Sequence, residues 1–573
     1  MDKISKKIKM IKNRIKLLRK KFSKFNIDGY IIPKNDDYFG EYAKTDRLKI
    51  ISEFSGSAGF AVILKKKNHL FVDGRYTLQA KKQSGKNFHI YEIPKFFPKN
   101  VYKKKLTLGI NPKLFTKKIL NIYFGNNIKF KHIENDLIVN KITKEKNKPF
   151  FNLKNKITGE THNSKINRLC KILNSKKTKY LFITAPENIA WILNIRGYDN
   201  PNSPIPNCRM LLTNRKKIYL FAEQGKAKKI IKSGKLTANR VFHTKKLNEI
   251  LYQLDHGNII IDNLSCSIFY ENIIKTKFNI ISEIDPTYEL KSIKNKTEIK
   301  GMIKSHILDG VALTKFIYWM KNGNKKKITE IRAEKKLEKF RSLNKEYIYP
   351  SFNTIAGSGP NGAIVHYRAT KKSDRSINKQ DLFLCDSGGQ YKYGTTDVTR
   401  TLCFGKQSCD IKNIYTKVLK GHIAVASADL KKYNNGSKID VLARKSLKES
   451  GLDYSHGTGH GVGFFLNVHE GPQAISRFNS VKIREGMILS NEPGFYKEGK
   501  YGMRIENLVF VKKINNKIFF ENLTLAPLEK ELINFKLLNK SEKDYIFFYH
   551  LNVYSKLSKY LNESERKWLA KLI

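Results

Sequence analysis

The stretch DLFLCDSGGQYKYGTTDVTRTLCFG, residues 381–405, constrains the fold more than any other part of the sequence. An apolar run ends at Asp386, a glycine-rich turn follows, and a second strand begins near Asp397. This pattern predicts a hairpin in which the two carboxylates face each other across neighbouring strands. Because two acidic groups so placed repel each other unless cations hold them, the hairpin also predicts a cation site.

Two glutamates stand in similarly apolar surroundings farther along the chain. Glu492 lies in ILSNEPGFY and Glu506 in YGMRIENLVFV, and both segments are expected to form strands. Arg504 precedes Glu506 by two residues, which in a strand puts the two side chains on one face. Acidic side chains in such a background are rarely buried unless they are paired or bound to metal.

The segment HGTGHGVGFFLNVHEGP, residues 456–472, holds the three histidines His456, His460 and His469 together with five glycines. The alternating glycines disfavour a helix, since each would weaken it by roughly 1 kcal/mol relative to alanine. In an extended or looped backbone, histidines four residues apart need not converge on one ion. One of His456 and His460 can therefore bind metal while the other faces the substrate.

Taken singly these residues are ordinary, but together they form an ordered set of Asp, Asp, His, Glu and Glu. Four carboxylates and one imidazole suit two divalent cations, and oxygen-rich ligation favours Mn²⁺ or a similar ion. Bridging carboxylates would hold the ions roughly 3.5 to 4 Å apart, close enough for one shared water to become hydroxide near neutral pH. The candidate ligands are Asp386, Asp397, His460, Glu492 and Glu506.

The sequence GSGPNG, residues 357–362, formally fits a dinucleotide-binding pattern. Pro360 interrupts it, and a strand-like run, AIVHY, follows where a phosphate-binding helix should begin. We expect no nucleotide site here.

The chain has 573 residues, enough for two or three cores, and a formal net charge of +60. Its lysines are spread throughout, which favours solvated faces over the alternative, a dedicated nucleic-acid surface. Six irregularly spaced cysteines indicate reduced thiols rather than disulfides or a thiolate zinc site. The lack of a signal-peptide pattern and of a long apolar run predicts a cytoplasmic protein that does not bind membranes.

Three domains are expected, with boundaries at 1–153, 154–290 and 291–573. The second repeats the helix and strand pattern of the first, which indicates a weak internal duplication. The third opens with Asn295 and Glu298 in an N-cap arrangement before a helical apolar pattern. The linker before it is not rich in Gly or Ser, so docked domains are expected.

The ligand order, with HGTGHGVG, VHEGP, SNEPGFY and RIEN, resembles the pita-bread metallopeptidases and, among them, the aminopeptidase P family. The resemblance covers nearly the whole chain, from DGYIIPKNDDYFGEYA, FSGSAGFAVI and VDGRYTLQAKKQ through ENIAWILNIRG to FFYHLNVYSKL. It implies an α/β (α+β) fold in which two creatinase-like domains precede a pita-bread catalytic domain with a C-terminal extension.

The resemblance also implies roles for individual residues. Asp386 would bind one ion, Asp397 and Glu506 would bridge, and His460 and Glu492 would bind the other ion. The family's non-ligand histidines, which contact substrate and shuttle protons, match His366, His456 and His469, and Arg504 joins them as a catalytic residue.

The activity so implied is metal-dependent hydrolysis of the first peptide bond of peptides whose second residue is proline. A metal-bridging hydroxide would attack the carbonyl, and imidazoles would pass a proton to the leaving nitrogen. A homodimer with no specific nucleic-acid partner is expected. Two alternatives stay open: a prolidase restricted to dipeptides, and a non-catalytic pita-bread module that binds RNA or protein, although such relatives typically lose ligands.

Overall fold

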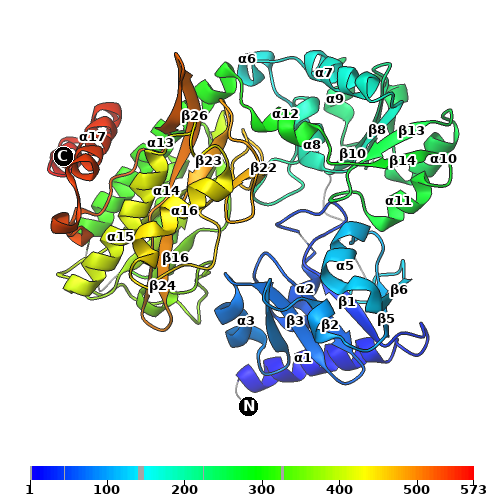
Figure 1. The fold of residues 1–573 in the computed structure, drawn as a ribbon, viewed down its shortest axis with the longest axis horizontal. Coiled ribbons are helices and arrows are strands. Elements are labelled where there is room, and N and C mark those ends of the chain that lie inside the picture. Colours follow the sequence, from blue (N-terminus) through cyan, green and yellow to red (C-terminus); the bar gives the residue numbers. More distant parts are fainter. Residues whose placement is uncertain (1–2, 44, 140–147, 224, 324–327) are drawn as a thin grey trace. The chain divides into compact units, whose positions relative to one another are not determined.

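The computed structural model describes residues 3–43, 45–139, 148–223, 225–323 and 328–573, and the chain forms two compact units (Figure 1). Unit 1 comprises residues 1–154 and 160–287, and unit 2 comprises residues 155–159 and 288–573. No helix among the described residues is long and apolar enough to cross a membrane.

A six-stranded sheet of order β4-β3-β2-β1-β5-β6 forms the first part of unit 1. β2 is antiparallel to both of its neighbours and the other adjacent pairs are parallel. Helix α1 (Lys3–Arg19) covers the sheet because Ile11, Ile15 and Leu18, at helical spacing, are buried in its core. The strands are β1 (Gly29–Pro33), β2 (Phe60–Leu64), β3 (Asn68–Asp73), β4 (His89–Ile93), β5 (Leu106–Ile110) and β6 (Ile128–His132), and the other helices are α2 (Arg47–Ser52), α3 (Thr77–Ser84), α4 (Pro98–Val101) and α5 (Lys117–Phe124).

The second sheet of unit 1 has the order β12-β11-β10-β8-β13-β14 and repeats the directions of the first strand by strand. The internal duplication predicted from the sequence pattern is thus confirmed as a duplication of topology. Its strands are β8 (Tyr180–Ile183), β10 (Cys208–Thr213), β11 (Ile218–Ala222), β12 (Val241–Phe242), β13 (Asn258–Ile261) and β14 (Asn279–Ser282). Its helices are α7 (His162–Ser175), α8 (Pro186–Ile192), α9 (Lys228–Lys232), α10 (Leu247–Tyr252) and α11 (Ile268–Ile274), and β7 (Phe151–Asn152) pairs with β9 (Ile195–Arg196).

Unit 2 contains two sheets that are each backed by a pair of helices. The first sheet, β16-β17-β20, packs on α13 and α14 around Phe316, Leu337 and Phe383. The predicted N-cap is confirmed: the Asn295 side chain accepts from the Glu298 N–H, and Glu298 returns the bond. The elements are α13 (Lys296–Asn322), α14 (Glu330–Ser342), β16 (Ile355–Ser358), β17 (Phe383–Ser387) and β20 (Val398–Leu402), with β15 (Tyr347–Pro350), β18 (Gly389–Tyr391) and β19 (Gly394–Thr395) in a small sheet beside them.

The second sheet, β22-β21-β23-β26-β27, packs on α15 and α16 around Val425, Ala443 and Val509. Its elements are α15 (Cys409–Ala426), α16 (Gly436–Lys448), β21 (Gly459–Gly461), β22 (Glu470–Ile475), β23 (Ile488–Asn491), β26 (Asn507–Ile514) and β27 (Lys517–Asn522). The hairpin β24 (Gly494–Lys497) and β25 (Tyr501–Arg504) lies between β23 and β26 in the chain.

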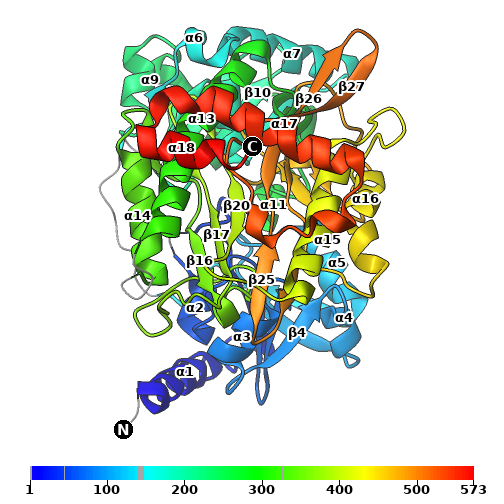
Figure 2. The same ribbon diagram turned by 90° about the vertical axis from the view of Figure 1, so that its left-hand side faces the viewer.

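The C-terminal helices α17 (Lys540–Leu557) and α18 (Glu563–Ala570) pack on α13, and α17 also contacts α15 (Figure 2). The other α-helices of the described residues are α6 (Asn155–Thr158) and α12 (Thr287–Ser292). The expectation of a strand at AIVHY is wrong, since residues 362–366 form turns and a bend after a 3₁₀ turn at Gly359–Asn361, and Tyr367 is irregular. A helix does not begin there either, consistent with the rejection of GSGPNG as a dinucleotide motif.

Candidate metal centre

The predicted hairpin is formed by β17 and β20, and it carries the two aspartates. Asp386 stands opposite Thr399, and Thr399 follows Asp397 by two residues. Asp397 and Thr399 therefore lie on one face, and the two aspartates are diagonal rather than direct neighbours. Both are buried, at 7% and 4% exposure.

The other three candidate ligands come from the second sheet of unit 2. His460 is the central residue of β21, which confirms that this glycine-rich segment is not helical. Glu492 and Glu506 were expected inside strands, but they lie directly after β23 and directly before β26. At these breaks the backbone N–H of Glu492 donates to Thr458 O (2.8 Å), and that of Glu506 donates to Thr399 O (3.1 Å). The second bond joins the two sheets at the site.

These residues converge on one small volume. One side-chain ligand atom each of Asp397, His460 and Glu506 lies within 4.8 Å of the other two. His460 Nε2 is 3.4 Å from Asp397 Oδ2 and 3.5 Å from Glu492 Oε1. The His460 Nδ1–H donates to its neighbour Gly461 O (2.9 Å), so Nε2 is the nitrogen turned toward the carboxylates.

The cluster carries more negative than positive charge. Burial, with the charges of Asp386 and Glu492, raises the pKa of Asp397 to about 6 even though His460 acts to lower it. Burial and the charge of Asp397 raise the pKa of Glu506 well above its usual value. Burial disfavours the His460 imidazolium, but its contact with Asp397 and the charge of Glu492 outweigh this and raise its pKa to about 9. Carboxylates this close together repel one another when ionised, and bound cations would remove that repulsion.

The donor set fits divalent metal ions. Asp386 Oδ2 accepts from Arg504 Nη2 (2.5 Å), while its Oδ1 is buried and has no hydrogen-bond partner within the described ranges. A buried acceptor of this kind is costly unless a cation or water meets it. Carboxylate oxygens with a single imidazole are ligands for hard or borderline ions, not for thiolate-seeking ones.

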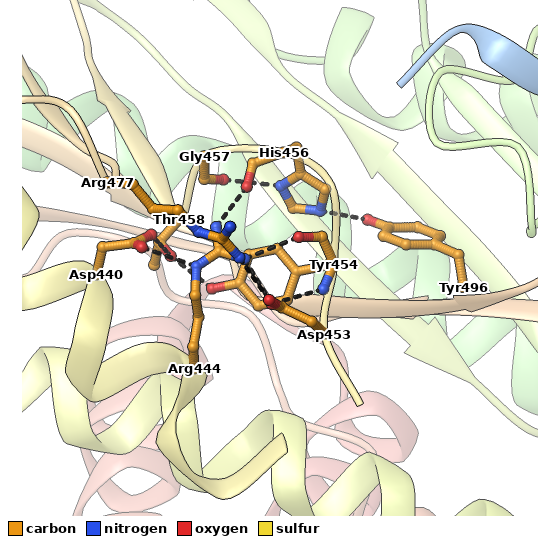
Figure 3. Close-up of polar contacts among 9 residues, drawn as sticks. All are labelled: Asp440, Arg444, Asp453, Tyr454, His456, Gly457, Thr458, Arg477 and Tyr496. Atoms are coloured by element: carbon orange, nitrogen blue, oxygen red, sulfur yellow. Dashed lines mark hydrogen bonds and ion pairs between the residues drawn. The ribbon is translucent and has the colours of Figure 1, made fainter. Parts of the chain in front are cut away.

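A hydrogen-bond chain connects Asp386 to His456. Arg504 Nη1 donates to Tyr496 OH (2.5 Å), and Tyr496 OH lies 2.9 Å from His456 Nε2 (Figure 3). The His456 Nδ1–H donates to Gly457 O (2.7 Å), so Nε2 is the acceptor of the tyrosine proton in the neutral ring. Burial raises the pKa of Tyr496 to about 12, which keeps the phenol protonated as this chain requires.

The two remaining predicted histidines lie near these groups to different degrees. The His469 ring packs edge-on against His460 at 4.3 Å between centroids. His366 is half-buried in the turn after Asn361, and its neighbours Ile364 and Tyr367 belong to the apolar cluster against which Tyr496 packs. The catalytic role of both histidines stays a prediction.

Sequence profiles of known families match the chain in four consecutive segments. Metallopeptidase family M24 matches residues 300–513, and the C-terminal region of that family matches residues 517–572. The creatinase/prolidase N-terminal domain matches twice, at residues 14–136 and 141–298.

Curated relatives extend the match to nearly full length. The chain is 34% identical to a probable Xaa-Pro aminopeptidase P from Laccaria bicolor over 97% of this chain and 92% of the relative. It is likewise 34% identical to Xaa-Pro aminopeptidase 1 from Dictyostelium discoideum over 98% and 96% of the two chains. The chain belongs to the Xaa-Pro aminopeptidase P group of metallopeptidase family M24.

Solved structures agree with this membership. The structure of an X-prolyl aminopeptidase from Caenorhabditis elegans, described as a cytosolic enzyme with a di-nuclear active site, covers 98% of this chain and 99% of its own, with a TM-score of 0.90 at 28% identity. The prolidase from Pyrococcus furiosus covers only 62% of this chain, with a TM-score of 0.50 at 26% identity. The fold is thus the mixed α/β fold with creatinase-like N-terminal domains and a C-terminal pita-bread domain.

Three polar residues of this M24 site were missed by the sequence analysis. Thr399 donates to Glu506 Oε2 (2.6 Å) and Ser490 donates to Glu492 Oε1 (3.1 Å), while Tyr496 links Arg504 to His456. For Thr399 and Ser490 the signal was available, since each lies two residues from a ligand and so on the same face of a strand. Tyr496 had no such signal, because its partners are set by the hairpin β24–β25.

Close backbone approach explains two of the glycines. A Cβ on Gly459 would lie 1.9 Å from Ser490 O, and one on Gly461 would lie 2.3 Å from Glu470 O. The glycines therefore let the neighbouring strands approach the backbone on both sides of His460.

Proposed function

We propose that this protein hydrolyses the peptide bond between the first residue of a peptide and a proline in second position. The observation that carries the proposal is the convergence of Asp397, His460 and Glu506, beside Glu492, into one buried, carboxylate-rich cluster. The names of the curated relatives and of the Caenorhabditis elegans enzyme support the choice of substrate.

Two divalent ions, which we propose to be Mn²⁺, would be held by the five candidate ligands. Asp386 would bind one ion, Asp397 and Glu506 would bridge, and His460 and Glu492 would bind the other. When bound, the ions would supply Lewis-acid polarisation of the scissile carbonyl and activation of water near neutral pH. The di-nuclear active site of the Caenorhabditis elegans enzyme supports the number of ions.

The chain's own side chains would orient groups and move protons. Arg504 holds Asp386 through Nη2 and Tyr496 through Nη1, which fixes both side chains. His456 and His469 would accept the proton that the attacking water loses and pass it to the leaving proline nitrogen, and His366 would contact the substrate. The neutral tautomer of His456 is supported by the hydrogen bond from its Nδ1–H to Gly457 O.

Proline is a chemically distinct leaving residue. The bond before it has no N–H, so an enzyme that selects it does not compete with general aminopeptidases. We favour an aminopeptidase of longer peptides over a dipeptide-restricted prolidase, because the prolidase structure covers 62% of this chain whereas the aminopeptidase structure covers 98%. We further propose the three-domain division at 153 and 290, a homodimer and a cytoplasmic location, the last supported by the cytosolic nature of the Caenorhabditis elegans enzyme.

One assay tests the proposal. The protein is loaded with Mn²⁺ and incubated with Arg-Pro-Pro, Arg-Ala-Ala and Gly-Pro, and the products are identified by mass spectrometry. We expect release of arginine from Arg-Pro-Pro only, with slow or no cleavage of Gly-Pro. Preferential cleavage of Gly-Pro would favour the prolidase alternative, and no cleavage of any peptide would favour the non-catalytic one.

A further inference from the structure

The five residues before β21 form an irregular segment with bends at Ser455, His456 and Thr458 and with alternating burial. Tyr454, His456 and Thr458 are buried, whereas Ser455 and Gly457 are exposed. Two backbone carbonyls of this segment, those of Tyr454 and His456, accept hydrogen bonds from one side chain (Figure 3).

Arg444 of α16 makes this contact. Its guanidinium donates from Nη1 to Tyr454 O (2.8 Å) and from Nη2 to His456 O (2.6 Å). The same group stacks on the Tyr454 ring, 3.9 Å from its centroid, and Nη1 also donates to Asp453 Oδ1 (2.6 Å). Arg444 is 3% exposed, so these contacts are made out of water.

Asp440, one turn earlier on α16, completes the contact on the other side of His456. Its Oδ2 accepts from Arg444 Nε (2.7 Å), and its Oδ1 accepts from the Thr458 hydroxyl (2.6 Å). Thr458 O in turn accepts the backbone N–H of Glu492 (2.8 Å). The ion pair of Arg444 and Asp440 thus binds the chain at Tyr454 and at Thr458, two residues before and two residues after His456.

We propose that Arg444, together with Asp440, is a positioning residue that fixes the His456 backbone so that its imidazole meets Tyr496 OH. The inference rests on the proposed function, in which His456 moves a proton. A lysine could neutralise Asp440, but a single ammonium cannot span the two carbonyls as the planar guanidinium does. Loss of Arg444 displaces His456 and leaves the five candidate metal ligands in place.

The test compares Arg444→Met and Arg444→Lys with a matched control, Arg477→Met. Arg477 donates to Asp453 Oδ2 (2.5 Å) in the same network, but its side chain is 51% exposed and the hydrogen bonds drawn in Figure 3 do not join it to His456. For Arg444→Met we expect kcat to fall by about 10²-fold with KM nearly unchanged and two metal ions retained, the scale of effect of a misplaced catalytic group. In Arg444→Lys kcat is expected to fall less, and in Arg477→Met it should hardly change.

A double-mutant cycle separates positioning from general damage. On a His456→Ala background, Arg444→Met should lower kcat little further, because the group through which it acts is gone. Losses that multiply, or an Arg444→Lys enzyme with wild-type kcat, would overturn the inference. If Arg444→Met does not fold, Arg444→Lys carries the cycle, since it keeps a cation beside Asp440.

A wild-type protein that cleaves no Xaa-Pro peptide would instead overturn the proposed function. In that case crystal structures decide the positioning role by themselves. The 2.9 Å contact between His456 Nε2 and Tyr496 OH should be lost in Arg444→Lys and kept in Arg477→Met. Its retention in both variants would contradict the inference.

Discussion

Two groups of side chains in unit 2 bring three potential metal ligands together at similar spacing. Asp397, His460 and Glu506 form one group, and Cys403, Glu529 and Glu531 form the other, with ligand atoms within 4.8 Å in each. By residue type and proximity alone, either could be a metal site. The difference between them lies in the cations that the protein itself supplies.

The second group contains its own cation. Lys321 Nζ lies 2.6 Å from Glu529 Oε2 and 3.4 Å from Glu531 Oε1, and it donates to Cys403 O (2.8 Å). Burial acts to lower the pKa of Lys321, but the charge of Glu529 outweighs it and the pKa is raised, so the ammonium stays charged. Burial and Glu529 raise the pKa of Cys403 to about 12, and a protonated thiol is a poor metal ligand.

The first group has no such balance. Burial raises the pKa values of both its carboxylates, Asp397 and Glu506, as it does that of Glu529. Here, however, no lysine lies between the two carboxylates among the described residues, and the site's arginine, Arg504, is bonded to Asp386. We therefore expect a metal site where buried negative charge exceeds the protein's own cations, and not wherever acidic groups lie close together.

The largest effect is expected for Asp397→Asn. The amide keeps the shape of the side chain but removes the charge proposed to bridge the ions, so metal content should fall well below two per chain. Activity should fall by at least about 10³-fold, since Lewis-acid stabilisation supplies several kcal/mol. Metal is counted by plasma mass spectrometry beside steady-state kinetics. An Asp397→Asn protein that binds no metal but keeps full turnover would show that the first group is no more a metal site than the second.

The next effect separates His460 from His456. His460→Ala should lose one metal equivalent together with activity. His456→Ala should keep both ions and lose about 10²- to 10⁴-fold in kcat, the usual contribution of a general acid or base. The same metal counts and kinetics decide it. A His456→Ala enzyme that has shed an ion would show that the two roles are reversed.

The sequence was sufficient to predict the structure where a local residue pattern determines how the strands are arranged. The hairpin around Asp386 and Asp397, the duplicated N-terminal plan and the non-helical segment at His460 are all present. Each depends on strand periodicity, on turn glycines or on their spacing. Family motifs supplied what periodicity could not, namely which of the acidic residues belong together.

The sequence was insufficient where side chains from distant segments meet. Glu492 and Glu506 were predicted inside strands, but each lies one residue outside its nearest strand. The exact end of a strand depends on where the neighbouring strands stop pairing, which the local sequence does not show. Lys321 and Glu529 are more than 200 residues apart, so no local pattern could predict that this acidic group is already neutralised. Arg444 likewise meets His456 only through the tertiary fold.

Metal binding to the first group should depend on pH. With the pKa of Asp397 at about 6 and that of His460 at about 9, the metal-free cluster holds protons that an ion must displace. Mn²⁺ affinity should therefore rise with pH, up to about tenfold per unit for each proton displaced, and fall below pH 6. Calorimetry in buffers of different ionisation enthalpy measures the protons released. An affinity independent of pH between 5 and 8 would contradict the charge argument.

A smaller effect, on stability rather than activity, is expected for Lys321→Met. Removing the ammonium leaves the Glu529 carboxylate, 4% exposed at its side chain, without its cation. The free energy of unfolding should fall by about 3 kcal/mol, as for other buried pairs broken on one side. Urea unfolding followed by fluorescence measures it. Adding Glu529→Gln should restore part of the loss, because the buried charge is then gone as well.

The smallest effect is expected for Glu531→Gln, the exposed member of the second group. Its side chain is 64% exposed and 3.4 Å from Lys321, so water already screens the pair. Such pairs contribute about 0 to 1 kcal/mol, and the unfolding midpoint should hardly move. Activity and metal content should match the wild type, because Lys321 is still held by Glu529. The contrary result would be a third metal ion that binds the wild type and is lost in Glu531→Gln. It would show that the Lys321 ammonium does not exclude metal from the second group, and the contrast with the first group would then fail.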